Sequence, residues 1–272
     1  MKNYKPVSEN AYLVTLDVSS LYTNIPHNDG IDACRYFLEE NNNNNHKYQI
    51  DCICNLIEVV LKNNFFQFGD KYYLQKMGTA MGSAMAPAYA SLFMGKLEKE
   101  FLATCDLSPD VWYRFLDDIF MIWTHSLDEL HEFIDKINSF HPHIKFTYNI
   151  SETNVSFLDV NVAIDNHKNL KTSVHVKPTN VHQYVYSSCH PKPCKDSIPY
   201  SQAKRYRRIF SDDDEFKNSI HELRDLNLNR NYPPKVVDNA FDQIIHTTQD
   251  DTIKCKLSNI LLAEINAESS VL

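Results

Sequence analysis

Two adjacent carboxylates interrupt a run of apolar and aromatic residues near the middle of the chain. Asp117 and Asp118 stand between Leu116 and Ile119, with aromatic residues on both sides. Burying an unpaired carboxylate is costly in free energy, and two neighbouring carboxylates also repel each other, so such a pair needs a cation. The pattern predicts a strand, a tight turn that carries both aspartates, and a second strand, with a divalent metal ion held at the turn.

A third carboxylate, far upstream, belongs to the same argument. Asp17 lies in a stretch rich in β-branched and aromatic residues, 11–18, which predicts a buried strand. If this strand lies beside the hairpin, Asp17 and Asp117 face each other at the edge of a sheet. Two carboxylates and substrate phosphates are the ligands that a pair of Mg²⁺ ions about 4 Å apart requires. Each aspartate alone could be a strand end or a solvated turn, but together they favour a metal site.

The distribution of charge points to a phosphate-bearing substrate. The 272 residues are 43% hydrophobic and 23% charged, as in an ordinary soluble protein of one large domain or two modest ones. The net charge is -8, yet residues 168–208 hold nine basic residues and one acidic residue, which gives +8 there and -16 elsewhere. A basic block beside an acidic, metal-binding block suits an enzyme that acts on phosphates.

The cysteines and the hydropathy pattern bear on the compartment. Seven cysteines without regular spacing predict reduced thiols, and hence an intracellular protein, nuclear or cytoplasmic. No stretch approaches the roughly 18 apolar residues of a membrane span, so no membrane partner is expected. The sequence leaves the oligomeric state open.

The order of the predicted elements indicates an α+β fold, in which helices back an antiparallel sheet. Helices are expected at 29–40, 52–63, 88–102 and 126 to about 140. Strands are expected at 11–18, 144–149, 156–164 and up to 176, with two hairpins, one at 65–74 and one around the double aspartate. A proline-containing loop follows, and from Tyr200 onward the pattern is mainly helical.

Three segments resemble the successive palm motifs of reverse transcriptases, in the variant found in Penelope-like retroelements, a group related to telomerase. They are LDVSSLYTNIP at 16–26, MGSAMAP at 81–87 and YRFLDD at 113–118. Later segments at 157–160, 190–191 and 197–202 are similar to those that follow the palm in that family. The resemblance spans roughly Leu13 to Tyr232, with the motifs in the family's order.

The resemblance implies a right-hand polymerase palm over residues 1–165, followed by a thumb-like or connector region over 166–272 that is mostly helical and carries a basic helix. Asp17, Asp117 and Asp118 would be the catalytic, metal-binding carboxylates for two Mg²⁺ ions, with Mn²⁺ as a substitute.

Further residues of the palm motifs would contact the nucleotide. The backbone carbonyl of Val18 would be another metal ligand. Tyr22, five residues after Asp17, would exclude the 2'-hydroxyl of a ribonucleotide, although a core aromatic residue is the alternative explanation. Gly82, which lacks a side chain, would let the backbone approach the nascent base pair.

Two later groups would contact the primer and the duplex. Phe157, Leu158 and Asp159 resemble the hairpin that positions the primer end. Residues 201–208 predict a basic helix whose cations suit phosphate contact: Lys204, Arg205, Arg207 and Arg208. The alternative for this helix is an ordinary solvated face.

The function implied is that of an RNA-directed DNA polymerase, with an RNA template, a DNA primer and deoxynucleoside triphosphates (dNTPs) as partners. The sequence departs from the family at Met81, where glutamine often stands, and at Phe115-Leu116, where tyrosine is commoner. Because only 16 residues precede Asp17, we expect the fingers to be missing, as in a fragment or a decayed copy. A catalytically inactive nucleic-acid-binding remnant is the alternative, and a nucleotide cyclase fits less well.

Overall fold

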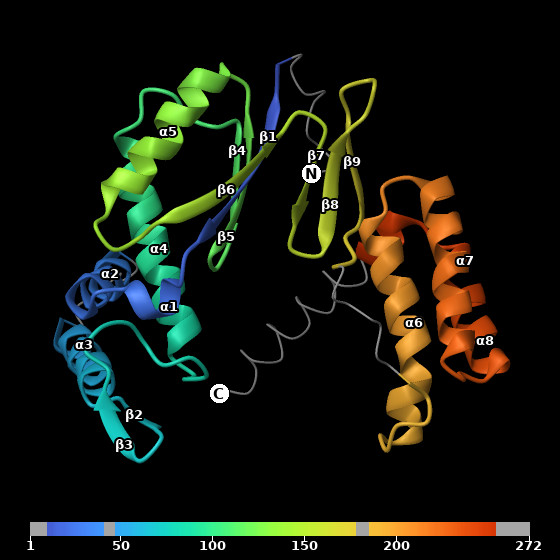
Figure 1. The fold of residues 1–272 in the computed structure, drawn as a ribbon, viewed down its shortest axis with the longest axis horizontal. Helices are drawn as coiled ribbons and strands as arrows, with labels where there is room; N and C mark the ends of the chain where they lie inside the picture. The colour runs from blue at the N-terminus through green and yellow to red at the C-terminus, as the bar shows by residue number, and fades with distance from the viewer. Residues whose placement is uncertain (1–9, 41–46, 178–184, 254–272) are drawn as a thin grey trace. The chain divides into compact units, whose positions relative to one another are not determined.

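The computed structural model describes residues 10–40, 47–177 and 185–253 (Figure 1). The chain divides into two compact units, of which one comprises residues 8–155 and the other begins at Ser156. In the part of the chain that the structure describes, no helix combines the length and the apolar character needed to cross a membrane.

The first unit is built on a four-stranded antiparallel sheet with the strand order β4-β5-β1-β6. Its strands are β1 (Tyr12–Val18), β4 (Val111–Phe115), β5 (Asp118–Trp123) and β6 (Phe146–Ser151). β1 and β5 are the two central strands, and their apolar residues are almost completely buried. The predicted antiparallel sheet and the hairpin around the double aspartate are confirmed.

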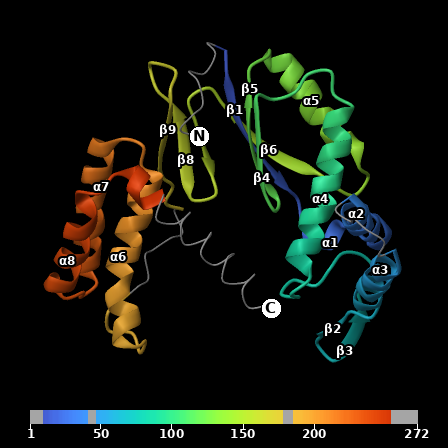
Figure 2. The same ribbon diagram turned by 180° about the vertical axis from the view of Figure 1, so that it is seen from behind.

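Two helices, α4 (Ala86–Ala103) and α5 (Leu127–Phe140), pack against one face of this sheet (Figures 1 and 2). α5 begins at a complete capping box, in which Ser126 and Glu129 exchange hydrogen bonds. Because side chains alternate along a strand, every second residue of β1 and β5 faces these helices. Those residues form one core with the helices: Val14, Leu16, Val18, Ile119, Met121 and Trp123.

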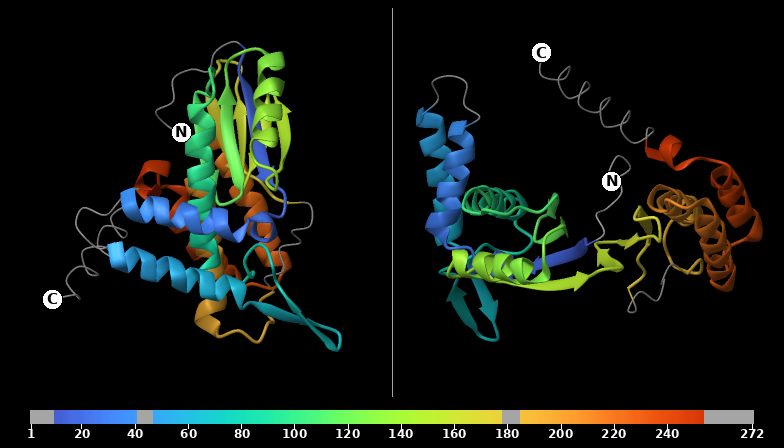
Figure 3. Two further views of the ribbon diagram at one scale, coloured as in Figure 1. Left: turned by 90° about the vertical axis from the view of Figure 1, so that its left-hand side faces the viewer. Right: turned by 90° about the horizontal axis from the view of Figure 1, so that it is seen from above.

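The remaining elements of the first unit lie between β1 and α4 in the sequence. They are α1 (Leu21–Asn24), α2 (His27–Glu40), α3 (Lys47–Lys62), β2 (Phe65–Phe68) and β3 (Lys71–Leu74). α2 packs closely on α4, because a Cβ atom at Gly30 would come within 2.0 Å of the Tyr89 hydroxyl. The hairpin predicted at 65–74 is confirmed as β2–β3, which turns at Gly69 and projects from the end of α3 (Figure 3).

Among the described residues, the second unit combines three long helices with a three-stranded sheet, whose first strand begins just before Ser156. The sheet has the order β7-β8-β9, and its strands are β7 (Asn154–Phe157), β8 (Val160–Ile164) and β9 (Leu170–Val174). The helices are α6 (Lys192–Ile209), α7 (Asp213–Asn229) and α8 (Pro234–Ile245). They share a core around Tyr206, Phe216 and Phe241.

Two predicted boundaries in the second unit were wrong. The strand expected over 156–164 is broken at Leu158, which has a φ of 54°, so the chain turns and forms β7 and β8 instead. The helical region was expected from Tyr200, but α6 begins at Lys192 and includes Pro199. A proline within a helix removes one backbone hydrogen bond, and here the helix continues despite that loss.

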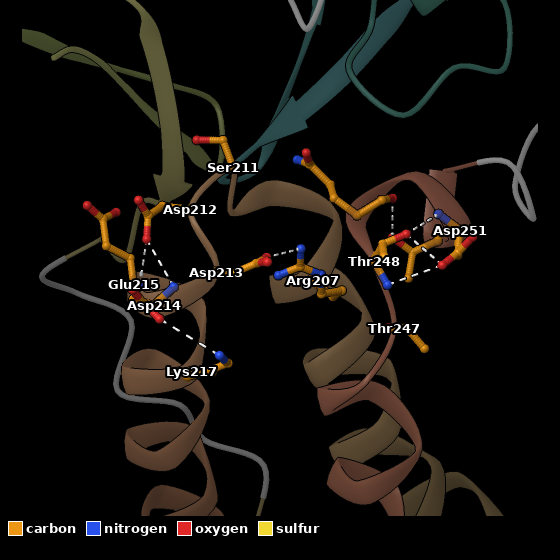
Figure 4. Close-up of polar contacts among 12 residues, drawn as sticks. Arg207, Ser211, Asp212, Asp213, Asp214, Glu215, Lys217, Thr247, Thr248 and Asp251 are labelled. Atoms are coloured by element: carbon orange, nitrogen blue, oxygen red, sulfur yellow. Dashed lines mark hydrogen bonds and ion pairs between the residues drawn. The ribbon is translucent and has the colours of Figure 1, made fainter. Parts of the chain in front are cut away.

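A buried guanidinium joins α6 to α7 (Figure 4). Arg207 is 4% exposed, and its Nη2 lies 2.5 Å from Oδ1 of Asp213. Its guanidinium carbon also lies 4.5 Å from the centre of the Phe216 ring. Between the two helices, Asp212 caps α7 by accepting hydrogen bonds from the N–H groups of Asp214 and Glu215. Arg207 therefore belongs to the packing of the helical unit.

We predict that Arg207→Ala lowers the free energy of unfolding of the second unit by about 2 kcal/mol, because it removes the ion pair, the cation–π contact and the packed side-chain stem. Urea unfolding followed by circular dichroism measures this change. Arg205→Ala is the matched control, since its partner Asp159 is largely exposed and the loss should stay below about 1 kcal/mol. Equal destabilisation by the two variants would contradict the structural role of Arg207.

Candidate active site

The three predicted carboxylates meet at one end of the first unit's sheet. In the antiparallel register of β1 and β5, Asp17 lies directly opposite Asp118. The backbone N–H of Val18 donates a hydrogen bond to the carbonyl oxygen of Asp117, at 3.2 Å. The end of β1 and the turn between β4 and β5 therefore lie together, as expected, although the residue opposite Asp17 is Asp118 and not Asp117 (Figure 1).

The face of the sheet on which two of these carboxylates lie follows from strand alternation. Leu16 and Val18, on either side of Asp17, face α4 and α5, and so does Ile119, which follows Asp118. Asp17 and Asp118 therefore lie on the sheet face that these helices do not cover. The turn itself consists of Leu116, with a φ of 56°, and Asp117, while Asp118 is the first residue of β5.

The electrostatics of this cluster favour a cation. The pKa of Asp17 is raised above its ordinary value, first by partial burial and second by the negative charge of Asp117. Like charges on directly opposed strand residues are also destabilising, which applies to Asp17 and Asp118. A divalent cation between these groups would remove both costs.

The donor chemistry suits a hard cation such as Mg²⁺, which prefers oxygen ligands and usually keeps several waters or substrate phosphates. Among the described residues, no three His, Cys, Asp or Glu side chains are arranged closely enough to form a metal site by themselves. Asp17, Asp117 and Asp118 meet through the pairing of their backbones but do not form a complete set of metal ligands, so the remaining ligands would come from the substrate.

Tyr22 lies directly after this cluster, in the short helix α1. Ser20 enters α1 with a φ of 52°, and the Tyr22 ring packs partly against the core. The backbone of α1 is fixed by a second segment: the N–H of Thr79 donates to the carbonyl of Tyr22, at 2.7 Å. The N–H of Gly78 donates to the carbonyl of Ile25, at 2.9 Å.

Gly78 is a positioning residue for α1 that sequence reasoning missed. A Cβ atom there would lie 2.4 Å from the Tyr22 carbonyl oxygen, and the residue has a φ of 78°. Only glycine satisfies both conditions without strain. Its place in a glycine-rich run before Gly82 is the sequence signal that could have identified it.

At Gly82 the backbone conformation, and not close packing as at Gly78, favours glycine. Its φ is +90°, but no atom lies within 4 Å of where a Cβ atom would stand. The preceding side chain, Met81, is 73% exposed. The turn that contains Gly82 is thus open to a ligand, in keeping with the expected approach of a base pair, and its backbone conformation favours glycine on its own account.

The residues predicted to contact primer and duplex belong to the second unit. Leu158 and Asp159 form the turn between β7 and β8, after Phe157 at the end of β7. Oδ2 of Asp159 lies 2.7 Å from Nη2 of Arg205, so the two predicted groups meet in an ion pair. This pair is partly exposed and contributes little to stability.

The basic helix is less uniform than its sequence indicates. Lys204 lies near the ring of Tyr200, with Nζ 5.7 Å from its centre, and Arg208 is partly buried. Arg207 is turned into the core, where its guanidinium is engaged by Asp213 and Phe216. We therefore leave Arg207 out of the surface considered for phosphate contact, because its charge is not presented to solvent.

Solved polymerase structures share the fold at low sequence identity. Telomerase from Candida albicans, solved with the TWJ fragment of telomeric RNA, has a TM-score of 0.60 and 9% identity over 88% of this chain and 41% of that one. The RNA-dependent RNA polymerase of a human picorbirnavirus has a TM-score of 0.55 and 11% identity over 84% of this chain and 42% of that one. These similarities confirm the predicted right-hand polymerase fold. This chain spans less than half the length of either relative.

The helical unit is similar to a second family, a similarity that sequence reasoning missed. A family model described as an animal helix-turn-helix domain matches residues 185–242. The structural signal is the connection between α7 and α8, which is four residues long and includes Asn231 with a φ of 64°. Such short turns are typical of the helix-turn-helix motif.

The first unit carries the sequence evidence for the family. Telomerase reverse transcriptase from Oryza sativa subsp. japonica is 33% identical over 89 residues, which are 28% of this chain and 7% of that protein. A family model described as reverse transcriptase (RNA-dependent DNA polymerase) matches residues 1–182, well over half of the 272 residues. With the three carboxylates brought together at the end of one sheet, this match shows that the chain belongs to the reverse transcriptase family.

Proposed function

We propose that this chain is an RNA-directed DNA polymerase that adds a deoxynucleotide to the 3'-hydroxyl of a DNA primer paired with an RNA template. One observation carries the proposal: the β1–β5 register sets Asp17 opposite Asp118, with Asp117 adjacent, at the end of a sheet in a chain of the reverse transcriptase family.

The carboxylates Asp17, Asp117 and Asp118 would hold two Mg²⁺ ions, or Mn²⁺ as a substitute, and the carbonyl of Val18 would add a ligand. When bound, such ions lower the pKa of an attacking hydroxyl and stabilise a leaving pyrophosphate. The contribution of the chain is geometric and electrostatic. It fixes Asp17 and Asp118 on two paired strands and Asp117 on the turn between β4 and β5, and bound cations would relieve the mutual repulsion of Asp17 and Asp117.

Tyr22 would select the sugar. Tyr22 is the fourth residue after Val18 and lies on α1. The N–H groups of Gly78 and Thr79 hold the backbone of this segment in place. A rigidly held aromatic ring leaves no room for a 2'-hydroxyl, whereas a mobile one would yield. The tight backbone packing at Gly78 supports this assignment.

The second unit would contact the template–primer duplex. The β7–β8 turn, formed by Leu158 and Asp159 after Phe157, would meet the primer end. Lys204, Arg205 and Arg208 of α6 would meet backbone phosphates. The ion pair between Asp159 and Arg205 supports a joint role, because it ties the hairpin to the basic helix.

The motifs at 16–26, 81–87 and 113–118 support a finer assignment, to a Penelope-like retroelement. The similarity to a plant telomerase reverse transcriptase is consistent with this, since that group is related to telomerase. An intracellular location, nuclear or cytoplasmic, is supported by the thiols: the six cysteines in the described part of the chain are all free.

We predict that Asp117→Asn reduces primer extension below detection, because it removes a metal ligand at the turn. The assay combines the protein with an RNA template, a DNA primer, dNTPs and Mg²⁺, and a gel-shift measurement verifies that the duplex is still bound. Asp110→Asn is the matched control, since Asp110 precedes β4 at the end away from the turn. Equal extension by the two variants would contradict the mechanism, and a wild-type protein that binds duplex without ever extending it would favour an inactive remnant.

We predict that Tyr22→Ala raises ribonucleotide incorporation relative to deoxynucleotide incorporation by about tenfold or more, because the ring no longer excludes the 2'-hydroxyl. The ratio is measured by single-nucleotide extension with each substrate. Tyr12→Ala removes the same ring from the start of β1, where it packs partly against the same core. An unchanged ratio in Tyr22→Ala, or the same rise in Tyr12→Ala, would remove the assignment.

We predict that Asp17→Asn raises the melting temperature at neutral pH when divalent cations are absent. A carboxyl whose pKa is raised in the folded state stabilises the fold below its ordinary pKa of 3.8, and this contribution is lost as pH rises through the raised value. Asp17→Asn has no carboxyl to ionise at this position, so it loses no stability over that pH range. Its melting temperature should therefore exceed that of the wild type by less as the pH falls toward 4. Adding Mn²⁺ should stabilise the wild type and not the variant. A variant that melts at the wild-type temperature at every pH would show that Asp17 is not strained by its neighbours.

A further inference from the structure

A nearly buried arginine lies directly behind the turn that carries Asp117. Arg114 is on β4, and its side chain is 13% exposed. Nη1 donates a hydrogen bond to the carbonyl oxygen of Leu116, at 3.1 Å, and Nη2 donates to the carbonyl oxygen of Ser91 in α4, at 3.3 Å. One planar guanidinium thus joins the turn of the β4–β5 hairpin to a helix on the covered face of the sheet.

Glu98 neutralises this arginine. Its Oε2 lies 2.8 Å from Nε of Arg114, and its side chain is 12% exposed. Its other oxygen, Oε1, accepts a hydrogen bond from the indole N–H of Trp112, at 3.1 Å. The Nε group makes no directed hydrogen bond, so Glu98 acts on Arg114 mainly as a counter-charge. Because the pair is neutral overall, it leaves the charge of Asp17 and Asp117 to be balanced by another cation.

The contact with Leu116 has a specific consequence for Asp117. A peptide group is planar, so fixing the carbonyl of Leu116 also fixes the N–H of Asp117. The next carbonyl, that of Asp117, accepts the hydrogen bond from Val18 in β1. Both peptide groups that flank Asp117 are therefore held, one from α4 through Arg114 and one from β1. Leu116 has a φ of 56°, a conformation that such contacts must stabilise.

We propose that Arg114, with Glu98 as its counter-ion, is a positioning residue for the polymerase reaction, which holds the backbone of the aspartate turn in the conformation that binds divalent cations. The inference rests on the proposed function. A guanidinium is needed because a flat group with several N–H donors can serve the turn, the helix and Glu98 at once, which a lysine ammonium at the end of a flexible stem cannot do.

The test compares Arg114→Lys, which keeps the charge, with Glu98→Gln, which keeps an oxygen for Trp112 and removes the counter-charge. Mn²⁺ affinity is measured by electron paramagnetic resonance of the free ion, and primer extension gives kcat and the KM for dNTP. Arg35→Lys is the matched control, since Arg35 pairs with Asp51 on α2 and α3, away from the turn. Circular dichroism verifies that each variant is folded.

We expect both variants to weaken Mn²⁺ binding and to lower kcat by about tenfold or more, with little change in the KM for dNTP and partial recovery at high Mg²⁺, because misplaced catalytic groups cost rate rather than substrate affinity. Arg35→Lys should match the wild type. A folded Arg114→Lys with wild-type Mn²⁺ affinity and kcat would overturn the proposal while leaving the polymerase function intact. A wild type that binds Mn²⁺ but extends no primer would remove the polymerase function, and the Mn²⁺ affinities of the variants would still decide the role of Arg114.

Discussion

The pairing of β1 with β5 is the constraint on which the rest of the first unit depends. It sets Asp17 opposite Asp118, and the same register turns their neighbours toward α4 and α5. A shift of one residue in either strand would exchange the two faces, placing a carboxylate in the core and an apolar residue at the site. The face packed against α4 and α5 therefore fixes which face carries the carboxylates, and the same strand pairing specifies the core and the candidate site.

The backbone around this pairing is held in conformations that side chains rarely adopt unaided. Ser20, two residues after the end of β1, and Leu116, in the turn before Asp117, both have positive φ angles. Neither is glycine, so each conformation has a cost that its surroundings must offset. Near Ser20, the segment at Gly78 and Thr79 packs against α1, and at Leu116 the guanidinium of Arg114 holds the carbonyl. The backbone around the carboxylates is thus held in part by segments distant in sequence, namely Gly78 and Thr79 at α1 and, through Arg114, Ser91 of α4.

Features that follow from local rules were predictable from the sequence, and those that need a distant partner were not. The strand at 11–18, the helix that begins near Ser126 and the hairpin at 65–74 each follow from neighbouring residues, and all three were found. The break at Leu158 lies within VSFLDVNV at 155–162, where mixed apolar and polar residues resemble one continuous strand until the left-handed conformation of Leu158 is known. The burial of Arg207 was likewise invisible, because composition cannot distinguish a guanidinium that pairs with Asp213 from one that faces a phosphate.

The helical unit matches a helix-turn-helix family, but its charges indicate which helix suits a polyanion. Helix-turn-helix proteins commonly present the last helix of the motif to nucleic acid. Here α7 and α8 together carry seven acidic and three basic residues, whereas α6 carries six basic residues and one acidic residue. Phosphate contacts contribute most of the affinity for a duplex. The negative charge of α7 and α8 repels phosphate, and the positive charge of α6 attracts it. The charges therefore support the proposed duplex contact at α6 and not at α7 or α8, and Arg207 and Asp213 join α6 to α7.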